Sequence, residues 1–154
     1  GHIAGPQHTS TGRHRAKAFS DYLRIHNLPS NLVEVTEKFT VEEGRQAFRK
    51  LLARDNNFTA IVAGNDLLAL GCMDAMREVG LLVPENVSIV GYDDILFLER
   101  MSPALTTILV PKYEIGSQAA KILLEMIGGE SKVPVVLRMQ PRLIVRNSTA
   151  IASR

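Results

Sequence analysis

The sequence predicts an α/β protein built around a parallel β-sheet. Short runs rich in β-branched residues alternate with longer stretches whose apolar residues recur at helical spacing, a pattern typical of β-α-β units. The chain has 154 residues, of which 45% are hydrophobic and 22% are charged. These values suit one folded domain and exclude a disordered or collagen-like chain. The longest apolar runs, such as 67–70 and 95–98, are far shorter than the ~20 residues that span a membrane.

The first half of the chain is predicted to hold three strands separated by two helices. An apolar stripe that includes Phe19, Tyr22 and Leu23 indicates the first helix. The second helix begins at a Thr-x-x-Glu capping box formed by Thr40 and Glu43, in which side chains satisfy the free N–H groups of the first turn. We expect the strands at residues 2–4, 32–35 and 59–63, and the first helix at residues 13–26.

The second half continues the same alternation. Asn65 is placed to cap a third helix that runs to residue 79 and ends at Gly80. A fourth helix is expected to begin near Pro111 and to end at Gly128 and Gly129. The remaining strands are expected at residues 87–91, 105–109, 135–137 and 142–145.

Polar and aromatic residues follow the predicted strands at their carboxyl ends. In an open parallel sheet, ligands bind beyond these ends, so we expect the residues to converge on one site. Arg offers a rigid fork of donors, Asn and Asp can each hold a pair of hydroxyls, and Phe presents a flat apolar face. The combination suits a neutral polyhydroxy compound or a flat heterocycle. The residues and ranges concerned are 7–15, Phe39, Asn65, Asp66, Asp93 and Asp94.

Each candidate also has an ordinary structural interpretation. Asn65 and Asp66 can simply cap a helix, Phe39 can belong to the core, and the two later aspartates can be solvated loop residues. Arg15 is more informative, because positive charge near the start of a helix opposes the helix dipole. A role facing a ligand would explain that cost, whereas a side chain facing solvent would merely tolerate it.

The sequence lacks the usual signatures of an enzyme. It has no dinucleotide-binding or nucleotide-binding glycine loop and no Gly-x-Ser-x-Gly motif. Its four histidines never occur at His-x-x-x-His spacing, and Cys72 is the single cysteine, which excludes an internal disulfide and a cysteine-based zinc site. We therefore expect a non-enzyme without metal or cofactor, in a reducing compartment. The basic residues near both ends are scattered, so a nucleic-acid surface on this chain is disfavoured.

A set of ordered motifs resembles a known family. The chain resembles the C-terminal part of the effector-binding core of LacI/GalR-type transcription regulators, over nearly its whole length. A single motif of this kind is weak, but the ordered set is specific. The motifs are IAGP (3–6), TGR (11–13), AIVAGND (60–66), ALG (69–71), VSIVGYDD (87–94), PALTTI (103–108), PRLIVR (141–146) and ST (148–149).

The resemblance implies a three-layer αβα lobe of the type I periplasmic-binding-protein-like fold. It also implies that the parent protein senses a small effector, a sugar or a related polar metabolite, in a cleft between two lobes. Carried over by position, Arg15, Asn65 and Asp93 match effector-contacting residues of the family, and Phe39 falls where an aromatic commonly packs on the effector. Effector binding would then shift the lobe arrangement and so alter operator binding by a cytoplasmic, homodimeric repressor.

The resemblance further implies that residues 1–154 are a fragment of such a core, mainly its C-terminal lobe. Residues from about 110 to 135 would belong to the other lobe, and the helix-turn-helix that binds operator DNA would lie outside the chain. The helix after Pro111 would then expose an apolar face, so we expect it to pack unusually on its own lobe or on a second copy. A periplasmic sugar-binding transport protein with the same lobe fold is the alternative hypothesis.

Overall fold

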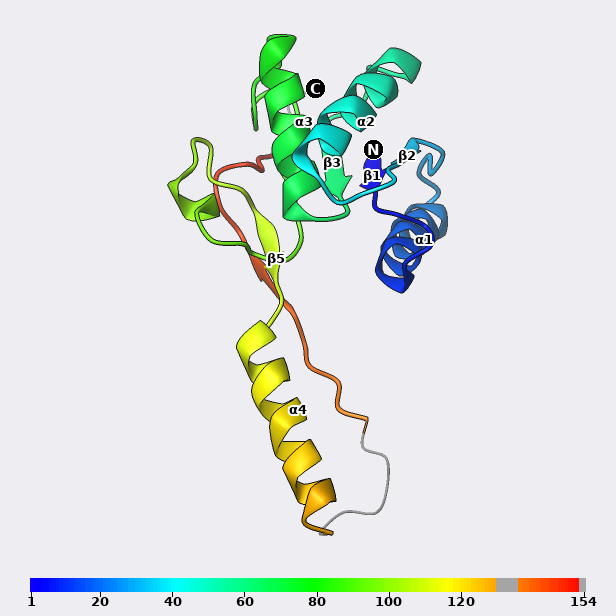
Figure 1. The fold of residues 1–154 in the computed structure, drawn as a ribbon. Helices are drawn as coiled ribbons and strands as arrows, with labels where there is room; N and C mark the ends of the chain where they lie inside the picture. The colour runs from blue at the N-terminus through cyan, green and yellow to red at the C-terminus, as the bar shows by residue number, and fades with distance from the viewer. Residues whose placement is uncertain (130–135, 153–154) are drawn as a thin grey trace.

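The computed structural model describes residues 1–129 and 136–152. The chain alternates strands and helices through most of this length (Figure 1). The elements are β1 (His2–Ala4), α1 (Ser10–Ile25), β2 (Val33–Val35), α2 (Val41–Arg54), β3 (Ala60–Ala63), α3 (Asp66–Glu78), β4 (Ser88–Val90), the 3₁₀ helix η1 (Leu98–Arg100), β5 (Thr107–Leu109), α4 (Lys112–Ile127) and β6 (Arg142–Ile144).

Strands β1 to β4 form one parallel sheet in the order β2-β1-β3-β4. Beyond β4, a parallel bridge joins Val90 to Thr106, and the Gly91 N–H donates to the Thr106 carbonyl at 2.9 Å. Strand β5 continues from there and pairs antiparallel with β6. The predicted parallel α/β architecture is therefore confirmed, with an antiparallel pair at one side.

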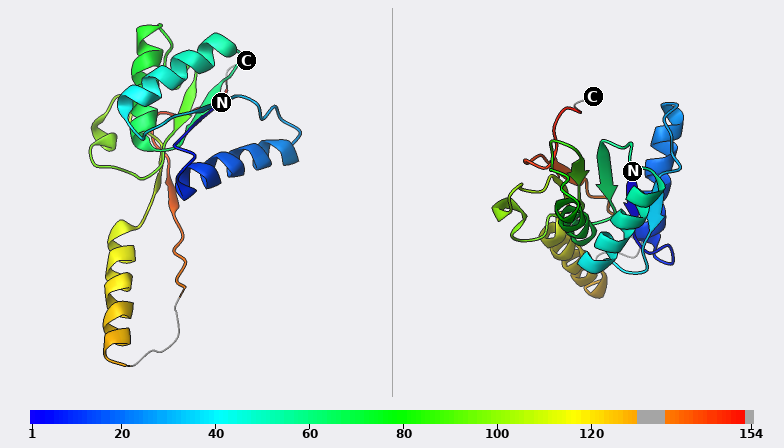
Figure 2. Two further views of the ribbon diagram at one scale, coloured as in Figure 1. Left: turned by 45° about the vertical axis from the view of Figure 1, so that its right-hand side comes forward. Right: turned by 90° about the horizontal axis from the view of Figure 1, so that it is seen from above.

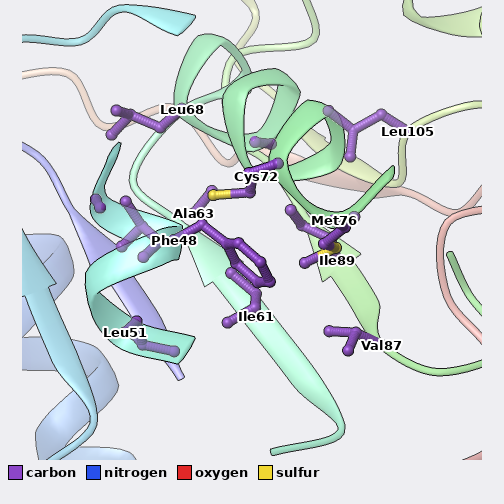
Figure 3. Packing of buried hydrophobic residues seen from close by; sticks show 14 of the residues in the cluster. Phe48, Leu51, Ile61, Ala63, Leu68, Cys72, Met76, Val87, Ile89 and Leu105 are labelled. Atoms are coloured by element: carbon purple, nitrogen blue, oxygen red, sulfur yellow. The ribbon is translucent and has the colours of Figure 1, made fainter. Parts of the chain in front are cut away.

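Helices lie on both faces of the sheet, as the three-layer prediction requires. Helices α2 and α3 cover one face, and α1 lies on the other (Figure 2). In β3 the side chains alternate, because Ile61 and Ala63 are buried under α2 and α3 whereas Val62 points to the α1 side and is 39% exposed. The core between sheet, α2 and α3 is closely packed (Figure 3). Its fully buried members include Phe48, Leu51, Ile61, Leu68, Cys72, Met76 and Ile89.

Side-chain caps set the starts of three helices. Asn65 Oδ1 accepts from the Leu68 N–H at 3.0 Å, as predicted. Thr40 caps α2 as predicted, but the Glu43 carboxylate accepts from the Glu37 N–H, so only half of the capping box forms. Helix α1 begins at Ser10 rather than at residue 13, because the Thr9 hydroxyl accepts from Gly12 and caps it three residues earlier.

Helix α4 extends away from the lobe and none of its residues is buried (Figure 1). The expectation that it packs on its own lobe is wrong in the part of the chain that is described. The apolar side of α4 faces Leu137 and Met139, in the segment that leads back to β6. An open crevice of about 370 Å³ lies between this segment and the helix. Leu123 remains 58% exposed and Met126 45% exposed. An amphipathic helix normally buries its apolar side against another element, and α4 does not do so among the described residues.

The predicted strand at 135–137 does not form at Val136 and Leu137, and residue 135 lies outside the described residues. These two residues run beside α4 with no neighbouring strand to supply ladder hydrogen bonds, and an apolar run becomes a strand only where a partner strand is available. The other predicted strands agree with the structure to within two residues at their ends. No helix in the described ranges is long and apolar enough to cross a membrane.

Candidate functional site

Arg15 joins the carboxyl ends of two strands. From the second turn of α1, its Nη1 donates to the Gly64 carbonyl just after β3. Its guanidinium carbon lies 3.5 Å from the ring centroid of Tyr92, just after β4, which is a close cation–π contact. Its Nη2 lies 3.5 Å from Asp93 Oδ1. The predicted convergence of Arg15 and Asp93 on one edge of the sheet is therefore present in the structure.

The ion pair between Arg15 and Asp93 is open rather than closed. Charge-assisted N–H···O bonds usually measure about 2.7–2.9 Å, whereas this pair stands 3.5 Å apart with 21% and 29% of the side chains exposed. A hydroxyl group that donates to the carboxylate and accepts from the guanidinium would satisfy both partners more fully. The edge thus offers an acceptor and several free donors side by side.

Asn65 fulfils the capping interpretation, and its contact with a ligand stays a prediction. Its side-chain oxygen is used as the cap of α3, and the residue is 8% exposed. It directly follows Gly64, whose carbonyl holds Arg15, so its amide nitrogen belongs to the same edge. No hydrogen bond from that nitrogen is present among the described residues.

Asp66 is a structural brace, so it does not belong to the ligand-facing edge. It is fully buried, its Oδ1 accepts from the Thr107 hydroxyl at 2.5 Å, and its Oδ2 accepts from the Ile95 N–H at 2.9 Å. Burial raises the pKa of Asp66 above its usual value, and the bonds from Thr107 and Ile95 oppose that rise. A Cβ on Gly91 would lie 2.2 Å from Asp66 Oδ1, so the brace also requires glycine at that position.

Phe39 lies at the carboxyl end of β1, against the backbone of Gly5. A Cβ on Gly5 would come within 2.0 Å of Phe39 Cε1, so the ring occupies the space that glycine leaves. The ring is half-buried and contacts the core cluster. The structure thus supports a packing role for Phe39, and its contact with an effector stays a prediction.

Asp93 and Asp94 form a strained turn at the end of β4. Their φ angles are 114° and 49°, a region that non-glycine residues seldom adopt. The Asp93 N–H donates to the Ile108 carbonyl at 2.9 Å, and Arg146 Nη1 lies 2.9 Å from Asp94 Oδ1. The Asp94 carboxylate is therefore neutralised within the protein, and only that of Asp93 is left for a ligand.

An apolar groove of about 580 Å³ lies beside this edge, between α1 and the face of the sheet on which α1 lies. Arg15 and Tyr92 line the groove and face the edge as well. The described residues contain no cluster of three or more His, Cys, Asp or Glu side chains that could hold a metal ion. The arrangement is suited to hydrogen bonding of a polar ligand, and it offers no activated nucleophile. The other groove residues include His2, Ala18, Phe19, Tyr22, Leu23, Val62, Val90 and Ile108.

Comparison with known proteins decides the family. The model of the periplasmic binding protein-like domain matches residues 1–149. The chain belongs to this periplasmic-binding-protein-like family. Within it, the chain is a core of the LacI/GalR regulator type, since its relatives are repressors of that type.

Three relatives illustrate the similarity. The HTH-type transcriptional repressor PurR of Escherichia fergusonii is 36% identical over 152 residues, which cover 97% of this chain and 44% of PurR. A complex of the transcriptional regulator CelR with cellobiose superposes with a TM-score of 0.88 at 34% identity, over 96% of this chain and 45% of CelR. A LacI family regulator from Enterococcus faecium with bound ribose gives 0.83 at 33% identity, over 97% and 55%. The chain thus spans less than half the length of the curated relatives it matches.

Three residues of this LacI/GalR-type core escaped the analysis of the sequence. Thr107 and Arg146 lie far along the chain from the aspartates that they contact, and no local sequence pattern predicts such pairs. Tyr92 directly precedes Asp93 in the sequence. An aromatic residue beside a predicted site residue at a strand end was the signal that could have identified it. Tyr92 holds Arg15 in place, whereas Thr107 and Arg146 engage Asp66 and Asp94 and so remove these two residues from the candidates.

Proposed function

We propose that this chain is the effector-sensing lobe of a LacI/GalR-type transcription regulator. Its effector would be a sugar or a related polar metabolite, held at the edge formed by Arg15, Asn65 and Asp93, with Phe39 beside it. The observation that carries the proposal is the convergence of Arg15 and Asp93 at the carboxyl ends of two strands, 3.5 Å apart, where a ligand hydroxyl beside the pair would bond to both. Tyr92 and the Gly64 carbonyl hold the guanidinium ready for that contact.

The chemistry of the edge favours polyhydroxy ligands. Carboxylate, amide and guanidinium groups together accept from and donate to vicinal hydroxyls. CelR with cellobiose and the Enterococcus faecium regulator with ribose are relatives seen with sugars. The same groups also suit a flat heterocycle, so nucleosides and purines are tested beside sugars.

The remaining functions belong to the parent protein. Helix α4, with the segment at about 110–135, would be part of the second lobe, and this agrees with its lack of buried residues. Operator binding would come from a helix-turn-helix outside these residues, and the parent would act as a cytoplasmic homodimer without enzyme activity, metal or cofactor. No observation on this chain favours the transport-protein alternative.

The proposal is tested by titrating the isotope-labelled chain with sugars, nucleosides and purines while recording amide chemical shifts. We expect one class of compound to shift the amides of Gly64, Asn65 and Asp93, and Asp93→Asn to abolish the response. Asp21→Asn is the matched control, since Asp21 lies on α1 and, among the described residues, forms its ion pairs with Lys17 and Arg24. Shifts confined to other surfaces, or an unchanged response in Asp93→Asn, would refute the assignment of this edge.

A further inference from the structure

Three elements hold the backbone and side chain of Asp93. Its N–H donates to Ile108 in β5, its carboxylate faces Arg15 from α1, and its carbonyl accepts a hydrogen bond from Lys112 Nζ. Lys112 is the first residue of α4. One residue of the candidate site is therefore bonded directly to the helix that leaves the lobe.

The position of Lys112 is unfavourable for α4 itself. A positive charge at the first position of a helix opposes the helix dipole, a cost that Glu114 in the same turn offsets in part, and Pro111 supplies no side-chain cap. The side chain is exposed, so no packing requirement explains it. Its bond to the Asp93 carbonyl is the contact that accounts for a lysine here.

The turn that Lys112 contacts is conformationally strained. Asp93 has a φ of 114° and Asp94 a φ of 49°, and such backbone persists only where neighbouring groups hold it. A displacement of the Asp93 Cα would move its carboxylate relative to Arg15 and, at the same time, its carbonyl relative to Lys112. A change in the contact of Asp93 with Arg15 is therefore expected to change its contact with Lys112.

We propose that Lys112 is a positioning residue that links the state of the Asp93 carboxylate to the orientation of α4. The proposal deepens the proposed function, on which it rests, because a ligand at Asp93 would then bias the helix expected to enter the second lobe. By thermodynamic reciprocity, any contact that fixes α4 would alter the affinity for a ligand at Asp93. Lys112 needs no contact with the ligand for this role.

A double-mutant cycle on the 154-residue chain tests the link without a ligand. The readout is amide hydrogen exchange at residues 115–117, where the Ile115 N–H makes the first backbone bond of α4 to Pro111. We expect Asp93→Asn, which releases Arg15, to change these rates by about fivefold, the lower end of usual coupling between sites. In the Lys112→Met background the same substitution should leave them unchanged.

Two further variants separate the bond from general effects. Lys121→Met removes a lysine of α4 whose contact is with Glu125 at 3.9 Å, and it should preserve the response to Asp93→Asn. Lys112→Arg keeps a long donor and should restore it. Additive effects of Asp93→Asn and Lys112→Met, or loss of the response in Lys121→Met, would overturn the link.

The same cycle is then repeated with the ligand found by titration in place of Asp93→Asn. A ligand that binds wild type and Lys112→Met alike, and alters exchange at residues 115–117 equally in both, overturns the proposed role of Lys112 while leaving effector binding intact. If no compound binds the edge but the ligand-free cycle is non-additive, effector binding fails and the Lys112 link stands.

Discussion

The buried hydrogen bond between Thr107 and Asp66 provides the sharpest test of how this lobe is held together. Both residues are fully buried, and the Thr107 hydroxyl donates to Asp66 Oδ1 at 2.5 Å. Thr107→Val keeps the shape of the side chain and removes the donor. A hydrogen bond to a charged group contributes about 1.5–3 kcal/mol, so we expect a loss of about 2 kcal/mol near neutral pH. For a chain of this size that corresponds to a fall in Tm of about 4–8 °C.

The loss should depend on pH because Asp66 is a carboxyl group. Burial raises the pKa of Asp66 in the folded protein above its unfolded value of 3.8, so ionised Asp66 reduces stability as pH rises above 3.8. Removing the Thr107 donor raises the pKa of folded Asp66 further. As pH rises above 3.8, the variant therefore loses more stability than the wild-type protein does. The difference between the two proteins should therefore be largest near neutral pH and smallest toward pH 3.8, where Asp66 is protonated in both.

Urea denaturation at a series of pH values measures this difference directly. Thr36→Val is the matched control, since buried Thr36 donates to the neutral carbonyl of Ala4 at 3.1 Å. That variant should lose about 1 kcal/mol at every pH. A loss in Thr107→Val that is independent of pH, or no larger than in Thr36→Val, would refute the assignment of Asp66 as a buried charge held by Thr107.

Three further predictions concern the core and one buried histidine. Phe48→Ala should cost about 3–5 kcal/mol by urea denaturation, because the ring is fully buried between α2 and the sheet. Gly44→Ala should also destabilise, by about 1–3 kcal/mol, since its Cβ would lie 2.2 Å from the Leu68 carbonyl where α2 and α3 cross; an unchanged midpoint would contradict that close approach. Burial lowers the pKa of His2 from 6.5 to about 4, against the bond to the Val62 carbonyl that raises it, so stability should fall as pH drops from about 6.5 toward 4. His2→Phe should flatten that part of the profile.

Most of the fold could be predicted because its signals are local. A cap such as Asn65 acts within one helical turn, and a β-branched run beside a helical period identifies a strand of a parallel sheet. The strand predicted at 135–137 failed at Val136 and Leu137 because strand formation depends on a partner, which lies elsewhere in the chain or is absent. Helix α1 begins three residues before the predicted start because the Thr9 hydroxyl caps it by accepting from the Gly12 N–H.

The candidate site was predictable in its residue types more than in their roles. The carboxyl-end rule selected Asn65, Asp66, Asp93 and Asp94 together, because it reports which strand end a residue follows. It does not report where the side chain points. Asp66 turns inward to Thr107 and Asp94 pairs with Arg146, and both partners come from the last third of the chain. These long-range partners decide which carboxylates are already engaged, Asp66 by a hydroxyl and Asp94 by a guanidinium.

Arg15 was selected in the sequence for one reason and is supported in the structure by another. The dipole cost was inferred for a helix beginning at residue 13, but α1 begins at Ser10 and Arg15 lies in its second turn, where the effect of the dipole is weak. In the structure Arg15 contacts the Tyr92 ring, the Gly64 carbonyl and the Asp93 carboxylate. Two of these contacts are closed and the third is open by roughly half an ångström or more relative to a direct charge-assisted bond. Other ion pairs of the chain, such as Arg54 with Glu34 at 3.5 Å, are equally long, so the distance alone does not mark a site. What distinguishes Arg15 is that its three contacts join the carboxyl ends of β3 and β4, where ligands of open parallel sheets bind.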